Sequence, residues 1–225
     1  MELCAGLTSE QWRTDLRPHL DEDNPAMWDK AIGVFERRMR ERFFRCIDML
    51  LKADDAGSAN ETVRPGFSIM ALCCLIVETL ESFHEGGRNA NAGIVDQPCT
   101  YPAGRCAKEP STARAFKDFL KRSPYFNADF RTSQIRGDFA NDVRNALLHE
   151  AETRRGWLIE RTVPADHILV NYDDGHRLNR TNFYRALHDE FEDYLAKLRD
   201  PSQDTLRKNF LKKMDLICDT EPGIE

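Results

Sequence analysis

The stretch Phe67-Ser68-Ile69-Met70-Ala71-Leu72-Cys73-Cys74-Leu75-Ile76-Val77 is apolar on nearly every side of a helix. Pro65 suits the first turn of that helix, and Gly86-Gly87 follows its expected end near His84. A helix that is hydrophobic all round must be covered by other elements. The uninterrupted apolar run from Ile69 to Val77 is too short to cross a bilayer. We therefore predict that residues 65–84 form the most buried helix of the fold.

Apolar residues at three- and four-residue spacing predict further helices on both sides of this one. Asp23-Asn24-Pro25 is a start signal for the first of them, and its arginines between positions 37 and 42 are expected to form a solvated face. Gly156 can end the helix that carries the motif described below. The predicted helices span residues 25–52, 65–84, 111–121, 132–156, 181–198 and 202–217.

The spacing of apolar residues changes after Gly156. Trp157-Leu158-Ile159 and the run from His167 to Tyr172 are typical of short strands, and Asp174-Gly175 is typical of a turn. We predict a mainly α fold in one domain over residues 1–225. It comprises an antiparallel helical bundle, a small β-hairpin insertion at residues 157–176 and a C-terminal helix pair at residues 181–218. Residues 86–110 are rich in Gly, Asn and Pro, which predicts a long irregular loop.

The composition limits the class of protein and its partners. The chain has 225 residues and a net charge of −6, which argues against a protein that coats nucleic acid non-specifically. Its seven cysteines are an odd number, and two of them, Cys73-Cys74, lie inside an apolar run, which favours a reducing compartment. The N-terminus, Met1-Glu2-Leu3-Cys4, does not resemble a signal peptide. We therefore expect a cytoplasmic protein without a membrane partner.

The hexapeptide Arg144-Asn145-Ala146-Leu147-Leu148-His149 carries the strongest chemical signal. A histidine can transfer protons near neutral pH, and an arginine can hold a phosphate in a fork and stabilise developing negative charge. These groups can cleave an RNA phosphodiester without a metal ion. The spacing of Arg and His alone is weak evidence, because similar pairs occur elsewhere in the chain: Arg13 and His19 stand six positions apart, one more than Arg144 and His149.

The helical pattern around the motif leaves two interpretations open. At about 100° per residue, Phe139, Val143 and Leu147 share the core side of the helix, whereas Leu148 lies outside it beside the polar residues. An apolar residue on that side suggests a surface that another molecule covers. The alternative is a loosely patterned surface helix on which His149 interacts with a neighbouring carboxylate.

The stretch from Val143 to Glu150, late in a helical bundle, resembles the signature of the HEPN superfamily, many of whose members are ribonucleases. Arg144 matches the arginine of that motif, Asn145 the polar residue after it and His149 the histidine. The resemblance covers roughly residues 26–156.

This resemblance implies a metal-independent endoribonuclease whose composite site forms between the two bundles of a homodimer. It implies that His149 acts as general base or acid, that Arg144 binds the scissile phosphate, and that Asn145 orients one of them. A product with a 2′,3′-cyclic phosphate, a role as a toxin or antiviral effector and a regulatory protein partner are further expectations. The same superfamily contains non-catalytic modules, so binding of a nucleotide or a protein partner is the alternative function.

Two acidic residues on the central helix are candidates to support the motif. Glu78 directly follows the apolar stretch, where a carboxylate must be paired or protonated, and Glu81 lies one turn further on. By the same resemblance, Glu78 is a candidate to orient Arg144 or His149, and Glu81 is the weaker candidate. The alternative places Glu78 where the helix emerges into solvent.

No metal or cofactor is expected. His84, Cys99 and Cys106 could supply three metal ligands, but the gap between the cysteines is wider than usual zinc spacing and a fourth ligand is not evident. The sequence contains no phosphate-binding glycine loop followed by Lys-Ser/Thr, no nucleophile elbow and no paired-His zinc helix.

Overall fold

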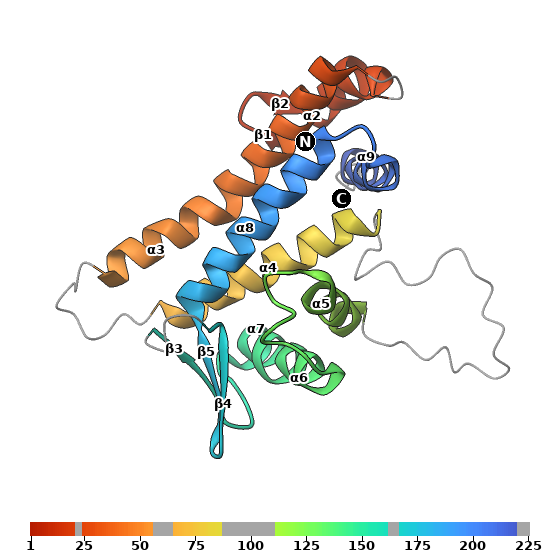
Figure 1. Cartoon of the computed structure of the whole chain (residues 1–225). Helices are drawn as coiled ribbons and strands as arrows, with labels where there is room; N and C mark the ends of the chain where they lie inside the picture. The colour runs from red at the N-terminus through yellow and green to blue at the C-terminus, as the bar shows by residue number, and fades with distance from the viewer. Residues whose placement is uncertain (21–23, 56–64, 87–110, 162–166, 220–225) are drawn as a thin grey trace, which may run out of the picture.

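A computed structural model describes residues 1–20, 24–55, 65–86, 111–161 and 167–219 (Figure 1). The helix α4, Gly66–His84, lies at the centre and contacts α3, α5, α7, α8, α9 and β3. By length and composition it is the one helix in these ranges that could cross a membrane, yet 56% of its apolar window is buried inside the protein. Contacts with neighbouring elements therefore account for its apolar character, as its sequence predicts.

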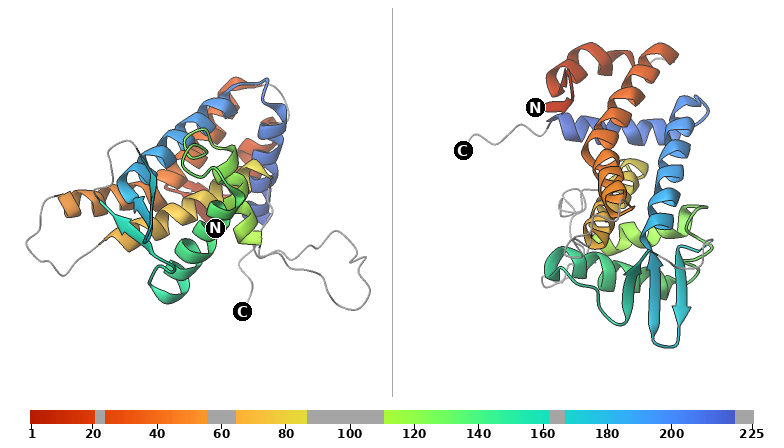
Figure 2. Two further views of the ribbon diagram at one scale, coloured as in Figure 1. Left: turned by 60° about the horizontal axis from the view of Figure 1, so that its bottom comes forward. Right: turned by 90° about the vertical axis from the view of Figure 1, so that its left-hand side faces the viewer.

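A long helical rod crosses the molecule beside α8, Arg180–Arg199 (Figures 1 and 2). The rod consists of α2, Pro25–Met39, a wide-turn π-helical segment η3, Arg40–Phe44, and α3, Arg45–Asp55. Asn24 caps its start by accepting a hydrogen bond from the Met27 amide at 3.3 Å. The helix predicted for residues 25–52 is thus present.

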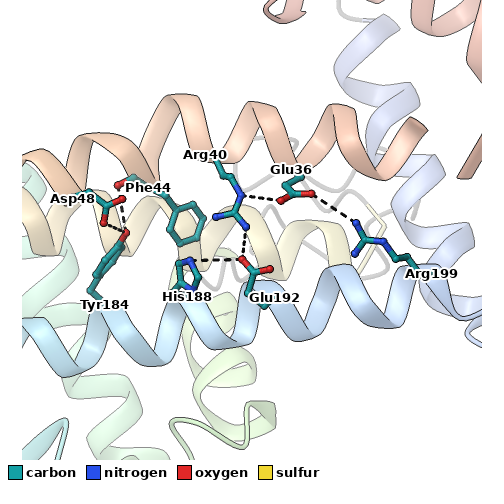
Figure 3. Close-up of polar contacts among 8 residues, drawn as sticks. All are labelled: Glu36, Arg40, Phe44, Asp48, Tyr184, His188, Glu192 and Arg199. Carbon is teal, nitrogen blue, oxygen red and sulfur yellow. Dashed lines mark hydrogen bonds and ion pairs between the residues drawn. The ribbon is translucent and has the colours of Figure 1, made fainter. Parts of the chain in front are cut away.

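A polar seam joins this rod to α8 along one side (Figure 3). Arg40 bridges Glu36 at 2.9 Å and Glu192 at 2.5 Å, so one guanidinium ties two helices together. One end of the seam is the Tyr184 hydroxyl, which donates to the Asp48 carboxylate at 2.6 Å. Burial and this hydrogen bond raise the pKa of Tyr184 well above its usual range.

The N-terminal residues form a small unit that the sequence did not predict. Its strands are β1, Glu2–Cys4, and β2, Leu7–Thr8, and its short helices are α1, Ser9–Gln11, η1, Trp12–Leu16, and η2, Arg17–His19. The unit packs against α9, Asp204–Asp219, where the Trp12 ring meets Phe210. Arg17 adds an ion pair with Asp215 at 2.8 Å.

The β-structure after the motif is a three-stranded sheet in the order β3-β5-β4. Its strands are β3, Trp157–Glu160, β4, Leu169–Tyr172, and β5, Gly175–Asn179. β4 and β5 form the antiparallel hairpin, and β3 pairs in parallel with β5. The hairpin predicted for residues 157–176 is therefore wrong in its pairing: the strand at 157–160 belongs to the sheet but not to the hairpin.

The motif lies on a helix that changes its pitch. Thr132 caps α6, Ser133–Asp138, which passes into the π-helical segment η4, Phe139–Asn145, and then α7, Ala146–Glu150. The helix ends at Ala151, in a left-handed conformation with φ 54°, and not at Gly156 as predicted. α5, Ser111–Arg122, packs against α6 and η4. The mainly helical architecture with a small β insertion is confirmed.

Candidate functional site

Arg144 is held by a carboxylate from the central helix. Its Nε donates to Glu78 Oε1 at 2.5 Å. The side chain of Arg144 is 14% exposed and that of Glu78 is 19% exposed. The pair joins η4 to α4, so the tertiary fold sets the direction of the guanidinium. The structure thus supports the interpretation in which Glu78 orients Arg144 and contradicts the one in which Glu78 emerges into solvent.

Asn145 continues this network on the motif helix. Its side-chain oxygen accepts from Arg144 Nη1 at 2.8 Å, and its amide nitrogen lies 3.5 Å from Asn141 Oδ1. The two hydrogen bonds to Arg144 engage Nε and one proton of Nη1. Three of the five donor protons of the guanidinium remain for a ligand or for water. The second residue of the motif therefore positions the first.

His149 lies apart from the Glu78–Arg144 pair, in the last turn of α7, and its side chain is exposed. It follows Arg144 by five residues, or about 7.5 Å along the helix axis. Within the described ranges no hydrogen bond, ion pair or ring contact to its imidazole is present, so the predicted alternative of a neighbouring carboxylate partner finds no support there. Next to it, Leu148 is 39% exposed.

Glu81 belongs to a different network and does not reach the motif. Arg122 donates to Glu81 at 2.6 Å and to Glu190 at 3.1 Å, which ties together α4, α5 and α8. The Ser123 hydroxyl donates to Glu190 at 2.7 Å. Burial raises the pKa of Glu81, and the attraction of Arg122 opposes that rise. The supporting role predicted for Glu81 is therefore replaced by a structural one.

Asp142 is a buried carboxylate that the sequence pattern did not identify. Asp142 is only 3% exposed, and among the described residues its Oδ2 has no hydrogen-bond partner. Burial raises its pKa, while Arg155, 3.8 Å away, acts in the opposite direction. Asp142 follows Phe139 by three residues and precedes Ala146 by four, so it lies beside the buried side of this helix. π-Helical turns occur often at functional sites.

Of the three candidate metal ligands His84, Cys99 and Cys106, the structure describes only His84. In the ranges that the structure covers, no group of three His, Cys, Asp or Glu side chains could hold a metal ion. Cys99 and Cys106 lie outside the described residues. His84 packs its ring against Tyr194 at 4.9 Å, and burial lowers its pKa to about 3. His84 is therefore a partly buried residue at the contact between α4 and α8.

Cys74 lies next to the candidate site, but its thiol is expected to be unreactive. Its thiol is fully buried, and burial raises its pKa far above the usual range. The negative charge of Glu78 adds to this rise, and Arg144 opposes it. A thiol that stays protonated is a poor nucleophile. Arg144, Asn145 and His149 therefore remain the candidate functional groups of this site.

Comparison of the chain with family models, with curated proteins and with solved structures gives no match.

Proposed function

We propose that the protein is a metal-independent endoribonuclease of HEPN type that acts in the cytoplasm. The observation that carries this proposal is the ion pair between Glu78 and Arg144, which presents a guanidinium of fixed orientation on the helix of His149. Holding a charged fork in place before substrate arrives is how electrostatic catalysis avoids a reorganisation cost. The cleavage class rests on the resemblance of the motif to that superfamily.

Arg144 would bind the scissile phosphate through the guanidinium N–H groups that do not donate to Glu78 or Asn145. The charges of Arg144 and Glu78 cancel, so a bound phosphate adds net negative charge to the site. The guanidinium would then interact with two anions, the carboxylate and the phosphate. Arg–phosphate hydrogen bonds are short and charge-assisted, and they strengthen as charge develops on the phosphate oxygens. Arg144 therefore stabilises the transition state more than the bound substrate.

His149 would transfer the protons. As general base it removes the proton of the 2′-hydroxyl, whose oxygen attacks phosphorus and expels the 5′-oxygen; as general acid it protonates that leaving oxygen. The products are a 2′,3′-cyclic phosphate and a 5′-hydroxyl. One imidazole cannot perform both steps at once. A second copy of the chain, with its own His149, supplies the other proton-transfer group in our proposal.

The exposed Leu148 supports a homodimer whose interface includes the end of α7. Leu148 is 39% exposed and directly precedes His149 in the motif. An apolar contact there would bring two copies of His149 close to one another around a twofold axis. A toxin or antiviral effector controlled by a partner protein is the biological role that we propose for such an enzyme.

The alternative is a non-catalytic HEPN module that binds a nucleotide or a protein partner. One observation favours it: Arg144 is mostly covered by Glu78 and Asn145, which also suits a structural ion pair. The two functions differ in whether His149 changes protonation state.

The test is incubation of purified protein with mixed RNAs in EDTA. We expect cleavage that ends in 2′,3′-cyclic phosphates and is lost in His149→Ala but retained in His19→Ala, a control at another exposed histidine. Cleavage that vanishes in EDTA and returns with magnesium would refute the mechanism. An equal absence of cleavage in all three proteins, combined with nucleotide binding, would establish the module instead.

A further inference from the structure

Three arginines of the long rod converge on the N-terminal strand. Arg38 Nη1 donates to the Leu3 carbonyl oxygen at 3.0 Å, and Arg42 Nη2 lies 3.4 Å from the same oxygen. Arg42 also lies 3.3 Å from the Glu2 carbonyl, and Arg37 donates to the Ala5 carbonyl at 3.1 Å. Two guanidinium groups that share one carbonyl oxygen are close neighbours of like charge. The arginine-rich solvent face that the sequence predicts is exposed at Arg37 and Arg42 but partly buried at Arg38.

The two arginines that share the Leu3 carbonyl repel each other. Burial lowers the pKa of Arg38, and the positive charge of Arg42 lowers it further. We call Arg37, Arg38 and Arg42 the N-terminal basic cluster. Arg38 is partly buried, whereas Arg37 and Arg42 are exposed. The repulsion between Arg38 and Arg42 therefore acts partly away from water, where like charges interact more strongly.

Among the described residues, no carboxylate forms an ion pair with Arg38 or Arg42. Glu41 accepts a hydrogen bond from the Ala5 amide at 3.5 Å, and the charges of Glu41 and Glu2 act on Cys4. Within the described chain, Arg38 and Arg42 have backbone carbonyls as hydrogen-bond partners and no ion pair. Other arginines of the fold differ: Arg17 binds Asp215, and Arg40 binds Glu36 and Glu192.

We propose that the N-terminal basic cluster binds a phosphate group. Guanidinium forks match the geometry of phosphate oxygens, and one phosphate can bridge two arginines that already lie together. Its negative charge would relieve the repulsion between Arg38 and Arg42 while the backbone carbonyls keep the forks in place. The site is concentrated on one small surface of a chain whose net charge is −6.

The cluster is separate from the candidate active site. β1 and α2 lie at one end of the molecule, whereas α7 lies at the other end, near the three-stranded sheet (Figures 1 and 2). Phosphate binding at the cluster therefore does not depend on the proposed nuclease activity. The phosphate can belong to a small molecule or to a nucleic-acid backbone, and the experiment below separates these sources.

The test is thermal unfolding in sodium phosphate, compared with sodium chloride at the same ionic strength. Chloride controls for general screening of like charges. We expect phosphate at ten times its dissociation constant to raise the melting temperature of the wild type by about 3–6 °C. Arg42→Gln should abolish most of the rise, because Arg42 is exposed and its removal leaves the Arg38 contact with Leu3 intact.

Arg45→Gln is the matched control, since Arg45 is an exposed arginine three residues further along the same rod. It should keep the full phosphate response, and Arg42→Lys should keep part of it because the charge remains. A short oligothymidylate, which lacks the 2′-hydroxyl, provides the second arm. A response to both probes assigns a nucleic-acid backbone, and a response to phosphate alone assigns a small phosphate compound.

Two outcomes would overturn the proposal. One is a wild-type melting temperature that rises no more in phosphate than in chloride at matched ionic strength. The other is an equal phosphate response in the wild type and Arg42→Gln. Perturbation of the Leu3 and Cys4 amide signals on phosphate addition gives a readout that does not depend on stability, and its absence in a folded wild type would likewise refute the site.

Discussion

Arg144 Nε lies 2.5 Å from Glu78 Oε1, although 66 residues separate them in the chain. The contact links the most buried helix to the motif helix, and it is partly shielded from solvent at both ends. Removal of one partner of such a pair costs more stability than removal of one partner of an exposed ion pair, because it leaves a charge in a poorly solvated place. The orientation of Arg144 and the packing of α4 against η4 are therefore coupled.

Glu78→Gln should destabilise the protein and weaken cleavage together. The amide keeps the shape but removes the charge that Arg144 needs, with an expected loss of about 1–3 kcal/mol in the free energy of unfolding. Urea denaturation measures this loss. Glu150→Gln is the control, since Glu150 pairs with Arg154 on the exposed surface and should cost only about 0.3–0.5 kcal/mol. Equal losses in the two variants would show that the Glu78 pair is an ordinary surface contact.

The sequence made Glu78 a candidate because it ends an apolar stretch on a helix that had to be buried, but it left open whether Glu78 pairs with the motif or emerges into solvent. Helix positions were likewise readable, since their apolar residues recur at helical spacing. β5 was missed because His176, Arg177 and Asn179 give it a polar character, and its parallel partner β3 is distant in sequence. Asp142 was missed because it lies beside the apolar side of its helix, where only the packing of the neighbouring elements decides whether a carboxylate is buried. Both failures concern tertiary contacts that local spacing does not encode.

His149→Ala should abolish cleavage without loss of stability. The imidazole is exposed and makes no contact within the described ranges, so its removal leaves no cavity. Loss of the group that transfers protons should also remove one limb of the pH–rate profile. Leu147→Asp, in contrast, places a charge at a position that is 8% exposed and should unfold the bundle. A His149→Ala protein that cleaves at the wild-type rate would rule out His149 as a proton-transfer group.

Leu148→Asp should convert a dimer into a folded, inactive monomer. The side chain is 39% exposed, so a charge there is tolerated in one copy but is repelled by its counterpart across a twofold interface. Sedimentation velocity and RNA cleavage measure the two consequences. Leu216→Asp is the control, because Leu216 is 38% exposed on α9, which lies away from the motif. Wild-type protein that is monomeric at micromolar concentration and fully active would refute the composite site.

His84→Phe should reduce the sensitivity of the fold to acid. Folding lowers the pKa of His84 to about 3, first through burial and then through Arg122 and Lys197. The unfolded chain therefore binds more protons than the folded one as the pH falls from about 6.5 to about 3, so stability that is fully present above pH 6.5 is lost in that window.

Phenylalanine keeps the ring contact with Tyr194 and cannot titrate. Between about pH 7 and pH 5 the variant should lose about 1–2 kcal/mol less unfolding free energy than the wild type. His19→Phe, at an exposed position, should follow the wild-type curve, and identical pH dependence in all three proteins would show that His84 carries no such linkage.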